Sequence, residues 1–155
     1  NYCDRFKGTL VNLYHTNADN LYHPYVRPQE NNHRTDVSWF ALTGKKNALL
    51  IVTDSLLEFN VSNYPLESFD SGDHRDDGRQ RPENPGQRHN CDPKPAELVD
   101  LFIDYRMMGL GGDDSWGAQP HEEYQINLAP GKISYGFSLI PLDKNANFEK
   151  AIKQY

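Results

Sequence analysis

The sequence predicts an all-β fold arranged as a β-sandwich. Several segments alternate apolar and polar residues with a period of two, which is typical of strands. Aromatic residues make up 12% of the chain and suit pleated sheets. Residues that favour turns separate the segments, and helical periodicity is nearly absent. About seven or eight short strands in one chain are typical of two packed sheets. Both faces of some strands carry apolar residues, so we expect packing on more than one side.

The expected strands follow one another along the chain. They span residues 8–14, 35–42, 48–54, 57–62, 98–106, 124–128 and 132–140. Turns are expected at 43–47 and 54–55, and "APGK" at 129–132 predicts a tight turn that joins the last two strands as a hairpin. In the last strand four side chains share one face: Ile133, Tyr135, Phe137 and Leu139. Residues 145–155 are the one helix candidate.

The stretch from residue 71 to residue 97 differs from the rest of the chain. It is polar and rich in glycine, proline and charge, so it cannot bury enough apolar surface to fold alone. We expect a long surface loop inside a single domain that spans residues 1–155. A linker between two small units is the alternative.

Charge and hydropathy exclude two classes of partner. The net charge is -6 at pH 7, whereas a nucleic-acid-binding protein needs a basic face that displaces counterions from phosphates. No apolar run approaches the roughly 20 residues that span a bilayer, and no signal peptide is visible. We expect no nucleic acid, no membrane and a cytoplasmic location, with the periplasm as the alternative. The chain begins with Asn1 rather than Met, so we expect a processed piece.

The cysteines and most histidines offer little chemistry. Cys3 and Cys91 are the only cysteines, and two widely separated thiols form neither a disulfide framework nor a zinc site. We expect both thiols to be buried or idle. Four scattered histidines lack the spacing of metal ligands and are expected to be solvated: His15, His74, His89 and His121.

The stretch "MMGLGGDDSWG" has the most unusual composition in the chain. Gly109, Gly111 and Gly112 permit positive φ and close backbone approach. Their spacing does not match a dinucleotide-binding fingerprint, and no helix is expected after them. Asp113 and Asp114 are of a type that ligates calcium, but the regular oxygen spacing of a calcium loop is missing. We expect these carboxylates to cap backbone amides in a turn.

Trp116 stands in this loop among small and polar residues. An indole there is either packed into the core or displayed to solvent, and the sequence favours neither. A displayed ring offers a flat apolar face with an N–H at its edge. That combination suits the apolar C–H face and polar rim of a sugar, which makes Trp116 a candidate substrate-binding residue.

Residues 21–40 form a second dense stretch of aromatic, basic and acidic side chains. They make either a polar binding cleft or a buried network that satisfies groups which are costly to bury alone. We favour the network, with Arg34 pairing Asp36 or Glu30. The side chains concerned are Tyr22, His23, Tyr25, Arg27, Glu30, His33, Arg34, Asp36 and Trp39.

No constellation in the sequence predicts nucleophilic catalysis. There is no G-x-S-x-G elbow and no cysteine near a plausible base. A glycosidase needs two carboxylates that face one scissile bond. Glu122 and Glu123 are adjacent, and on a strand they would point to opposite faces, so they are poor partners.

Four stretches together resemble the C-terminal portion of the large bacterial β-galactosidases, which are family 2 glycoside hydrolases. "NYCDR" is similar to that family's N-Y-x-D-R, and "LYHPYVRPQENNHRTDVSWF" to its Y-x-P-Y-V-x-P-x-E-N-x-x-R-T-D-V. "LEFNVSNY" is similar to its F-x-F-N-x-S-x-Y, and "MGLGGDDSWG" to its M-G-x-G-G-D-x-S-W. Order and approximate spacing agree from residue 1 to about residue 140.

The resemblance implies a fold and a role. The family's last domain is a β-supersandwich similar to galactose mutarotases, and this chain is similar to roughly its second half. In the family, the tryptophan of the G-G-D-x-S-W loop reaches into an active site on a separate barrel domain, where the sugar stacks against it. Trp116 holds that position. The residues that would shape its loop are Met108, Gly109, Gly111, Gly112, Asp113, Asp114 and Ser115.

The resemblance also implies what this chain lacks. The family's catalytic glutamates and its Mg and Na sites lie outside the region of similarity, so no catalytic residue, metal ligand or cofactor is expected here. The implied partners are the remaining domains of a parent β-galactosidase, above all its catalytic barrel, a galactoside substrate, and further copies in a homo-oligomer. The parent would hydrolyse terminal β-D-galactosides with retention, and the isolated chain is expected to be inactive.

The chain departs from the family's pattern in two places. These are an insertion around residues 72–92 and a C-terminal tail at 141–155. Two alternative functions stay open: a stand-alone, lectin-like galactoside-binding module, and a mutarotase-type epimerase, which would need a histidine acid and a glutamate base.

Overall fold

The computed structural model describes residues 5–6, 10–24, 31–69, 89–108, 113–114, 116–128 and 131–155. Its strands are β1 (Arg5–Phe6), β2 (His33–Thr43), β3 (Asn47–Ser62), β4 (Asp100–Asp104) and β5 (Phe137–Asp143). Its helical elements are the 3-10 helices η1 (Ala18–Asn20), η2 (Leu66–Phe69) and η3 (Glu122–Tyr124) and the α-helix α1 (Phe148–Ile152). Strand exceeds helix among these residues, so the all-β fold class is confirmed.

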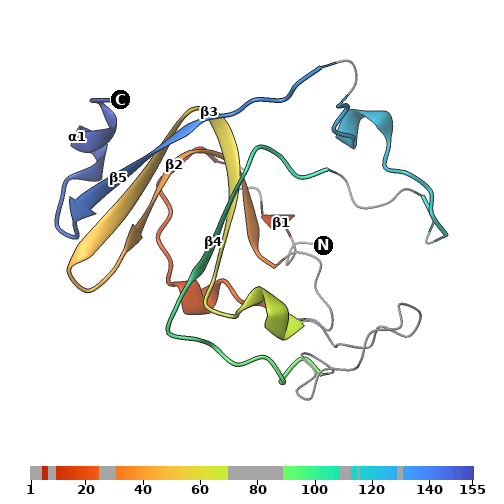
Figure 1. Cartoon of the computed structure of the whole chain (residues 1–155), viewed down its shortest axis with the longest axis horizontal. Helices are drawn as coiled ribbons and strands as arrows, with labels where there is room; N and C mark the ends of the chain where they lie inside the picture. Colours follow the sequence, from red (N-terminus) through yellow and green to blue (C-terminus); the bar gives the residue numbers. More distant parts are fainter. Residues whose placement is uncertain are drawn as a thin grey trace. The chain divides into compact units, whose positions relative to one another are not determined.

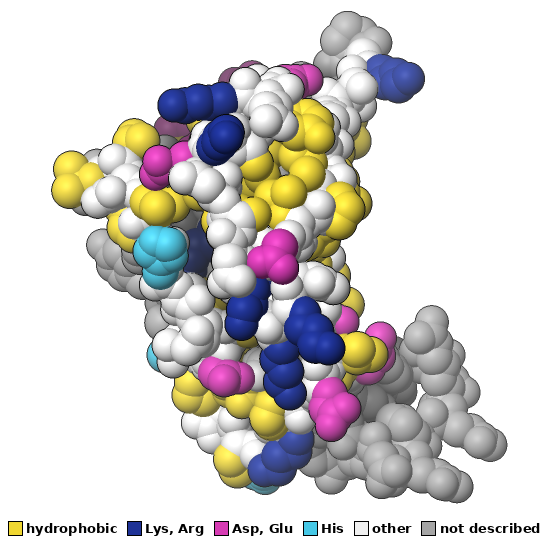
Figure 2. Space-filling model, turned by 90° about the vertical axis from the view of Figure 1, so that its left-hand side faces the viewer, with side chains coloured by type: hydrophobic (Ala, Val, Ile, Leu, Met, Phe, Trp, Pro, Cys, Tyr) yellow, Lys and Arg dark blue, Asp and Glu magenta, His cyan; other side chains and the backbone are white. Residues whose placement is uncertain are grey.

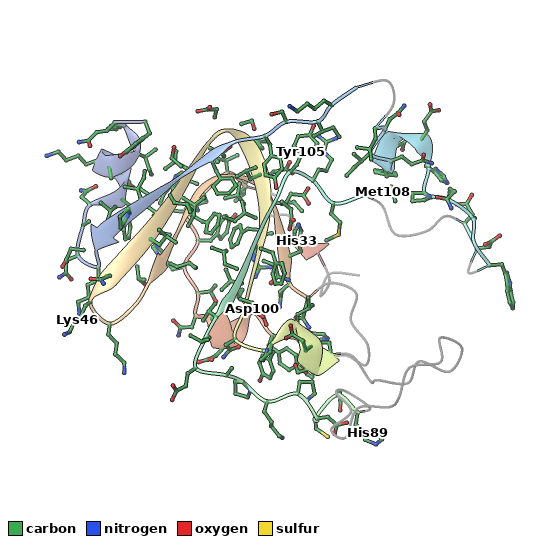
Figure 3. All side chains as sticks on the ribbon, viewed as in Figure 1. His33, Lys46, His89, Asp100, Tyr105 and Met108 are labelled. Atoms are coloured by element: carbon green, nitrogen blue, oxygen red, sulfur yellow. The ribbon has the colours of Figure 1, made fainter. Side chains whose placement is uncertain are left out.

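The described strands form one sheet in the order β1-β2-β3-β4, and β5 also pairs with β3 (Figure 1). β1 runs parallel to β2, and β5 runs antiparallel to β3. The β2–β3 turn is closed by the Gly44 N–H, which donates to the Asn47 carbonyl at 2.8 Å. Lys46 lies at the tip of this hairpin (Figure 3), which confirms the turn expected at 43–47. The second sheet of a sandwich is not formed by the described residues, so the sandwich stays a prediction.

The chain divides into two compact units, each built from two segments. One unit comprises Asn1–Thr35 and Phe59–Ile103. The other comprises Asp36–Glu58 and Asp104–Tyr155. The boundaries fall inside β2, β3 and β4, so each of these strands contributes residues to both units.

Each unit has its own buried side chains. In the unit that contains β5, β3 buries the neighbouring residues Leu50 and Ile51. Successive side chains of a strand point to opposite faces, so both faces of β3 are covered there, as expected. Leu50 is paired with Ile140 of β5, which is also buried. The other unit buries Leu21 and Val61. Other apolar side chains reach the surface, where Figure 2 shows them beside Lys and Arg side chains.

Two expectations about the first half of the chain are wrong. Residues 10–14, which belong to the first expected strand, form no strand. The turn expected at 54–55 is replaced by uninterrupted strand, because β3 continues through it. The Ser55 N–H donates to Thr53 Oγ1 at 3.2 Å, so this exposed backbone amide keeps a partner without a turn.

The hairpin expected across "APGK" is also wrong. Residues 124–128 form no strand, and Tyr124 is instead the last residue of the turn η3. The Gln125 side chain donates to the Pro120 carbonyl at 2.6 Å and ties this turn back on itself. β5 begins only at Phe137 and extends into the stretch expected to be a tail.

The structure tests some of the remaining expectations, and others concern residues that it does not describe. The helix candidate is confirmed at α1, where Asn147 Oδ1 accepts a hydrogen bond from the Lys150 amide at 2.8 Å and caps the helix. Cys91 is exposed and free. Cys3 and residues 71–88 of the expected surface loop lie outside the described residues. No helix in the described ranges has the length and hydropathy needed to cross a bilayer.

Two positions along β3 predict unequal costs of truncation. Leu50 is 0% exposed, whereas Leu56 on the same strand is 53% exposed. We expect Leu50→Ala to lower the free energy of unfolding by about 2–5 kcal/mol, and Leu56→Ala to lower it by less than about 0.5 kcal/mol. Urea denaturation of both variants measures the difference. Equal costs would contradict the burial assigned to β3.

Candidate functional site

The candidate site is the loop that carries Trp116. The indole is 93% exposed, so of the two placements that the sequence leaves open, the structure has the displayed one. No apolar packing holds a ring that is this exposed. Its position therefore depends on the backbone of its own loop.

Asp114 fixes the backbone on both sides of the indole. Its Oδ1 accepts a hydrogen bond from the Trp116 amide at 2.8 Å and a second one from the Ala118 amide at 3.2 Å. A carboxylate that accepts from amides two and four residues further on closes a local turn. This confirms for Asp114 the capping role expected from the sequence.

Gly117 is a loop-shaping residue that the sequence analysis missed. Its φ is +113°, a conformation that residues with a side chain rarely adopt. A Cβ added there would meet no atom within 4 Å, so the backbone and not a lack of space requires glycine. The sequence shows a glycine beside Trp116, but it does not show which of the loop's glycines has positive φ.

His121 is exposed, as expected, and its ring also has a partner that the sequence did not reveal. Its Nε2 lies 3.0 Å from Oδ1 of Asp113. Both side chains are exposed. The contact joins the first described residue of the loop to the residue just before η3.

Of the other residues predicted to shape the loop, the structure describes only Met108. Met108 is exposed, and Figure 3 shows it on the segment that follows β4 and Tyr105. The neighbouring Met107 amide donates to Glu58 Oε2 at 2.8 Å, which ties this segment to β3. The remaining predicted residues lie outside the described ranges: Gly109, Gly111, Gly112 and Ser115.

Glu122 and Glu123 do not lie on a strand. Both belong to the single turn of η3 and are exposed. The strand argument that pointed them apart therefore does not apply to them. Among the described residues, no group of three or more His, Cys, Asp or Glu side chains is arranged to hold a metal ion.

The described part of the dense stretch 21–40 forms a hydrogen-bonded network. The His23 amide donates to Asn31 Oδ1 at 2.9 Å, and Asn31 Nδ2 donates to the His23 carbonyl at 2.8 Å. Arg34 Nη1 donates to the carbonyl and to Oδ1 of Asn32 at 3.0 and 3.1 Å. Burial lowers the pKa of Arg34. Tyr25, Arg27 and Glu30 lie outside the described residues.

An aromatic cluster beside this network has a structural role. The rings of Tyr22 and Tyr64 stack with centroids 3.9 Å apart, and Phe69 lies 6.2 Å from Tyr22. The Tyr22 hydroxyl donates to the Asn90 carbonyl at 3.2 Å. Burial, with a smaller contribution from Tyr64, raises the pKa of Tyr22. These three rings pack on one another, whereas the Trp116 ring is exposed.

Comparison with known proteins decides the family. The profile of a family described as "Beta galactosidase small chain" matches residues 1–139. The chain belongs to the β-galactosidase small-chain family.

Curated relatives of this family member are β-galactosidases. The protein from Priestia megaterium is 30% identical over 146 residues, which cover 92% of this chain and 12% of the relative. The protein from Pseudoalteromonas haloplanktis is 29% identical over 139 residues, 90% of this chain and 11% of the relative. The protein from Leuconostoc mesenteroides is 29% identical over 147 residues, which cover 95% of this chain and 12% of the relative. The chain thus spans about 12% of the length of the relatives it matches.

Gly117 and Gly131 provide a matched pair of substitutions. A Cβ would meet nothing at either position, but only Gly117 has positive φ. Alanine at position 117 would be strained by about 1–3 kcal/mol at this φ. We therefore expect Gly117→Ala to change the local backbone conformation and to release the Trp116 and Ala118 amides from Asp114. Their amide proton signals in a 15N-correlated NMR spectrum should move upfield, and Gly131→Ala should leave them in place. Unmoved signals in Gly117→Ala would contradict the assigned loop geometry.

Proposed function

We propose that the chain is the non-catalytic C-terminal part of a β-galactosidase that hydrolyses terminal β-D-galactosides. In this proposal Trp116 provides the surface on which the sugar stacks, and the rest of the chain is scaffold. The catalytic carboxylates and the Mg and Na sites belong to the remaining polypeptide. The partners are that polypeptide, above all its catalytic barrel, and the galactoside.

The exposure of Trp116 carries the proposal. A ring that is 93% exposed is free to meet a ligand on its face, and an indole pairs an apolar face with a polar edge, as a sugar does. Asp114 fixes the backbone on both sides of the ring. Such fixing matters because small errors in the position of a substrate cost large factors in rate.

An exposed apolar row supports the view that the chain works beside other polypeptide. Ile133, Tyr135, Phe137 and Leu139 are between 36% and 53% exposed. The Tyr135 ring lies 6.0 Å from that of Tyr105 and 6.3 Å from that of Phe137. Contiguous exposed apolar side chains mark interaction surfaces. We propose that the remainder of the parent enzyme covers this row, since the relatives are several times longer than the chain.

A stand-alone galactoside-binding module is the second candidate function. This candidate is favoured because the residue that fixes the Trp116 backbone, Asp114, belongs to the same loop of the same chain. Display of the Trp116 ring therefore does not require contact with a second polypeptide. The two candidates differ in whether the isolated chain binds sugar.

Turnover of a chromogenic β-galactoside tests the first candidate. We expect the isolated chain to release no chromophore above the buffer blank, and addition of the rest of the parent polypeptide to restore activity. In the restored enzyme, Trp116→Ala should lower kcat/KM roughly thirtyfold, which is the loss of a contact of about 2 kcal/mol. The half-buried Trp39 provides the control, and Trp39→Phe should retain activity. Hydrolysis by the isolated chain would contradict the proposal.

Titration of the isolated chain with lactose separates the two candidates. The fluorescence of Trp116 should report contact with a sugar, because the ring is exposed. If the chain is part of a larger enzyme, we expect no saturable change. Saturable quenching that disappears in Trp116→Ala would instead support the binding module.

A further inference from the structure

We infer that the Asp113–His121 contact is a clasp that holds the Trp116 loop in the form that displays the indole. Asp113 and His121 are then positioning residues for the sugar-stacking ring. This inference rests on the proposed function, because a clasp matters for catalysis only if the ring meets a sugar. The contact itself, Nε2 to Oδ1 at 3.0 Å, does not depend on that function.

Local hydrogen bonds hold the backbone around His121 in place. Pro120 beside it is buried, and the Pro120 carbonyl accepts a hydrogen bond from Gln125 at 2.6 Å. The His121 carbonyl accepts from the Tyr124 amide at 2.9 Å, which closes the turn of η3. The backbone on both sides of His121 is therefore tied down, and its imidazole can hold another segment in place.

Asp113 and the indole lie on the segment that needs holding. The Asp113 side chain is 89% exposed, and Trp116 is exposed as well. Burial cannot order such residues, so polar contacts have to do it. The next residue, Asp114, accepts from the amides of Trp116 and Ala118. A contact that fixes Asp113 therefore also limits the movement of the carboxylate that shapes the turn around the ring.

The chemistry of the pair suits a clasp in either protonation state of the histidine. A neutral imidazole with its proton on Nε2 donates to the carboxylate, and a protonated imidazolium adds charge to the same hydrogen bond. Glutamine can also donate to Asp113, whereas alanine cannot. Comparison of His121→Ala with His121→Gln therefore separates the loss of the hydrogen bond from the loss of the imidazole.

Local motion of Trp116 tests the clasp without any sugar. In a Trp39→Phe background Trp116 is the single tryptophan, and time-resolved fluorescence anisotropy of the 155-residue chain reports how freely its ring moves. In His121→Ala and Asp113→Ala we expect the population of mobile Trp116 rings, relative to that of immobile rings, to rise roughly two- to tenfold. Loss of one hydrogen bond predicts a change of this size. His121→Gln should stay close to the parent. His89→Ala removes an exposed imidazole outside this loop and should change nothing (Figure 3).

Anisotropy that is unchanged in His121→Ala would overturn the clasp. If Trp39→Phe does not fold, 19F NMR of the chain labelled with 5-fluorotryptophan gives the same answer from the linewidth of the Trp116 signal, which Trp116→Phe assigns. Kinetics of the restored enzyme test the proposed function separately. A mobile ring in His121→Ala together with full activity in Trp116→Ala would keep the clasp and reject the sugar-stacking role. A lowered kcat/KM in Trp116→Ala with an unmoved ring in His121→Ala would do the reverse.

Discussion

The pairing of β3 is the constraint on which the described structure depends. Backbone N–H and C=O groups that leave water need partners, and at 16 residues this strand has many of them. β2, β4 and β5 all pair with it. Because Leu50 and Ile51 are both buried, apolar contact covers both faces of β3 near its start. One strand therefore unites parts of the chain that are far apart in sequence, including β5 and the apolar row that precedes and enters it.

Local patterns predicted the parts of the fold that local physics decides. β2, β3, β4 and β5 all lie on segments with apolar alternation, and α1 begins where Asn147 caps it. The failure at residues 124–128 occurred where the pattern was that of a strand but no described strand pairs with it. Tyr124, Ile126 and Leu128 alternate with polar residues as a strand would, yet Tyr124 and Leu128 are exposed. A period of two fixes which side chains share a face, but not whether another strand pairs with the segment.

The candidate site was predictable to a similar extent. The sequence singled out Trp116 and predicted the capping role of Asp114, because residue type alone limits what they can do. It could not decide whether the indole is displayed, since tryptophan is stable in both settings. It also missed Gly117 and the partner of His121. Both depend on backbone geometry: a positive φ at one residue, and a turn that brings residue 121 back to residue 113.

The two aromatic features of the chain are ordered by different forces. Tyr22 and Tyr64 are held by stacking and partial burial, whereas Trp116 has only the polar contacts of its loop. A typical hydrogen bond contributes about 0.5–1.5 kcal/mol and an exposed contact between charged groups about 0–1 kcal/mol, while fixing each backbone residue costs about 1–2 kcal/mol. The two bonds to Asp114 and the Asp113–His121 contact therefore favour one form of the loop without freezing it. If the ring stacks on a sugar held elsewhere, the remaining order has to come from the surface against which the loop docks. Under the proposed function, the exposure of Trp116 and its contact with a sugar would have one cause: the residues of the loop favour the displayed form, and docking against other polypeptide would complete its order.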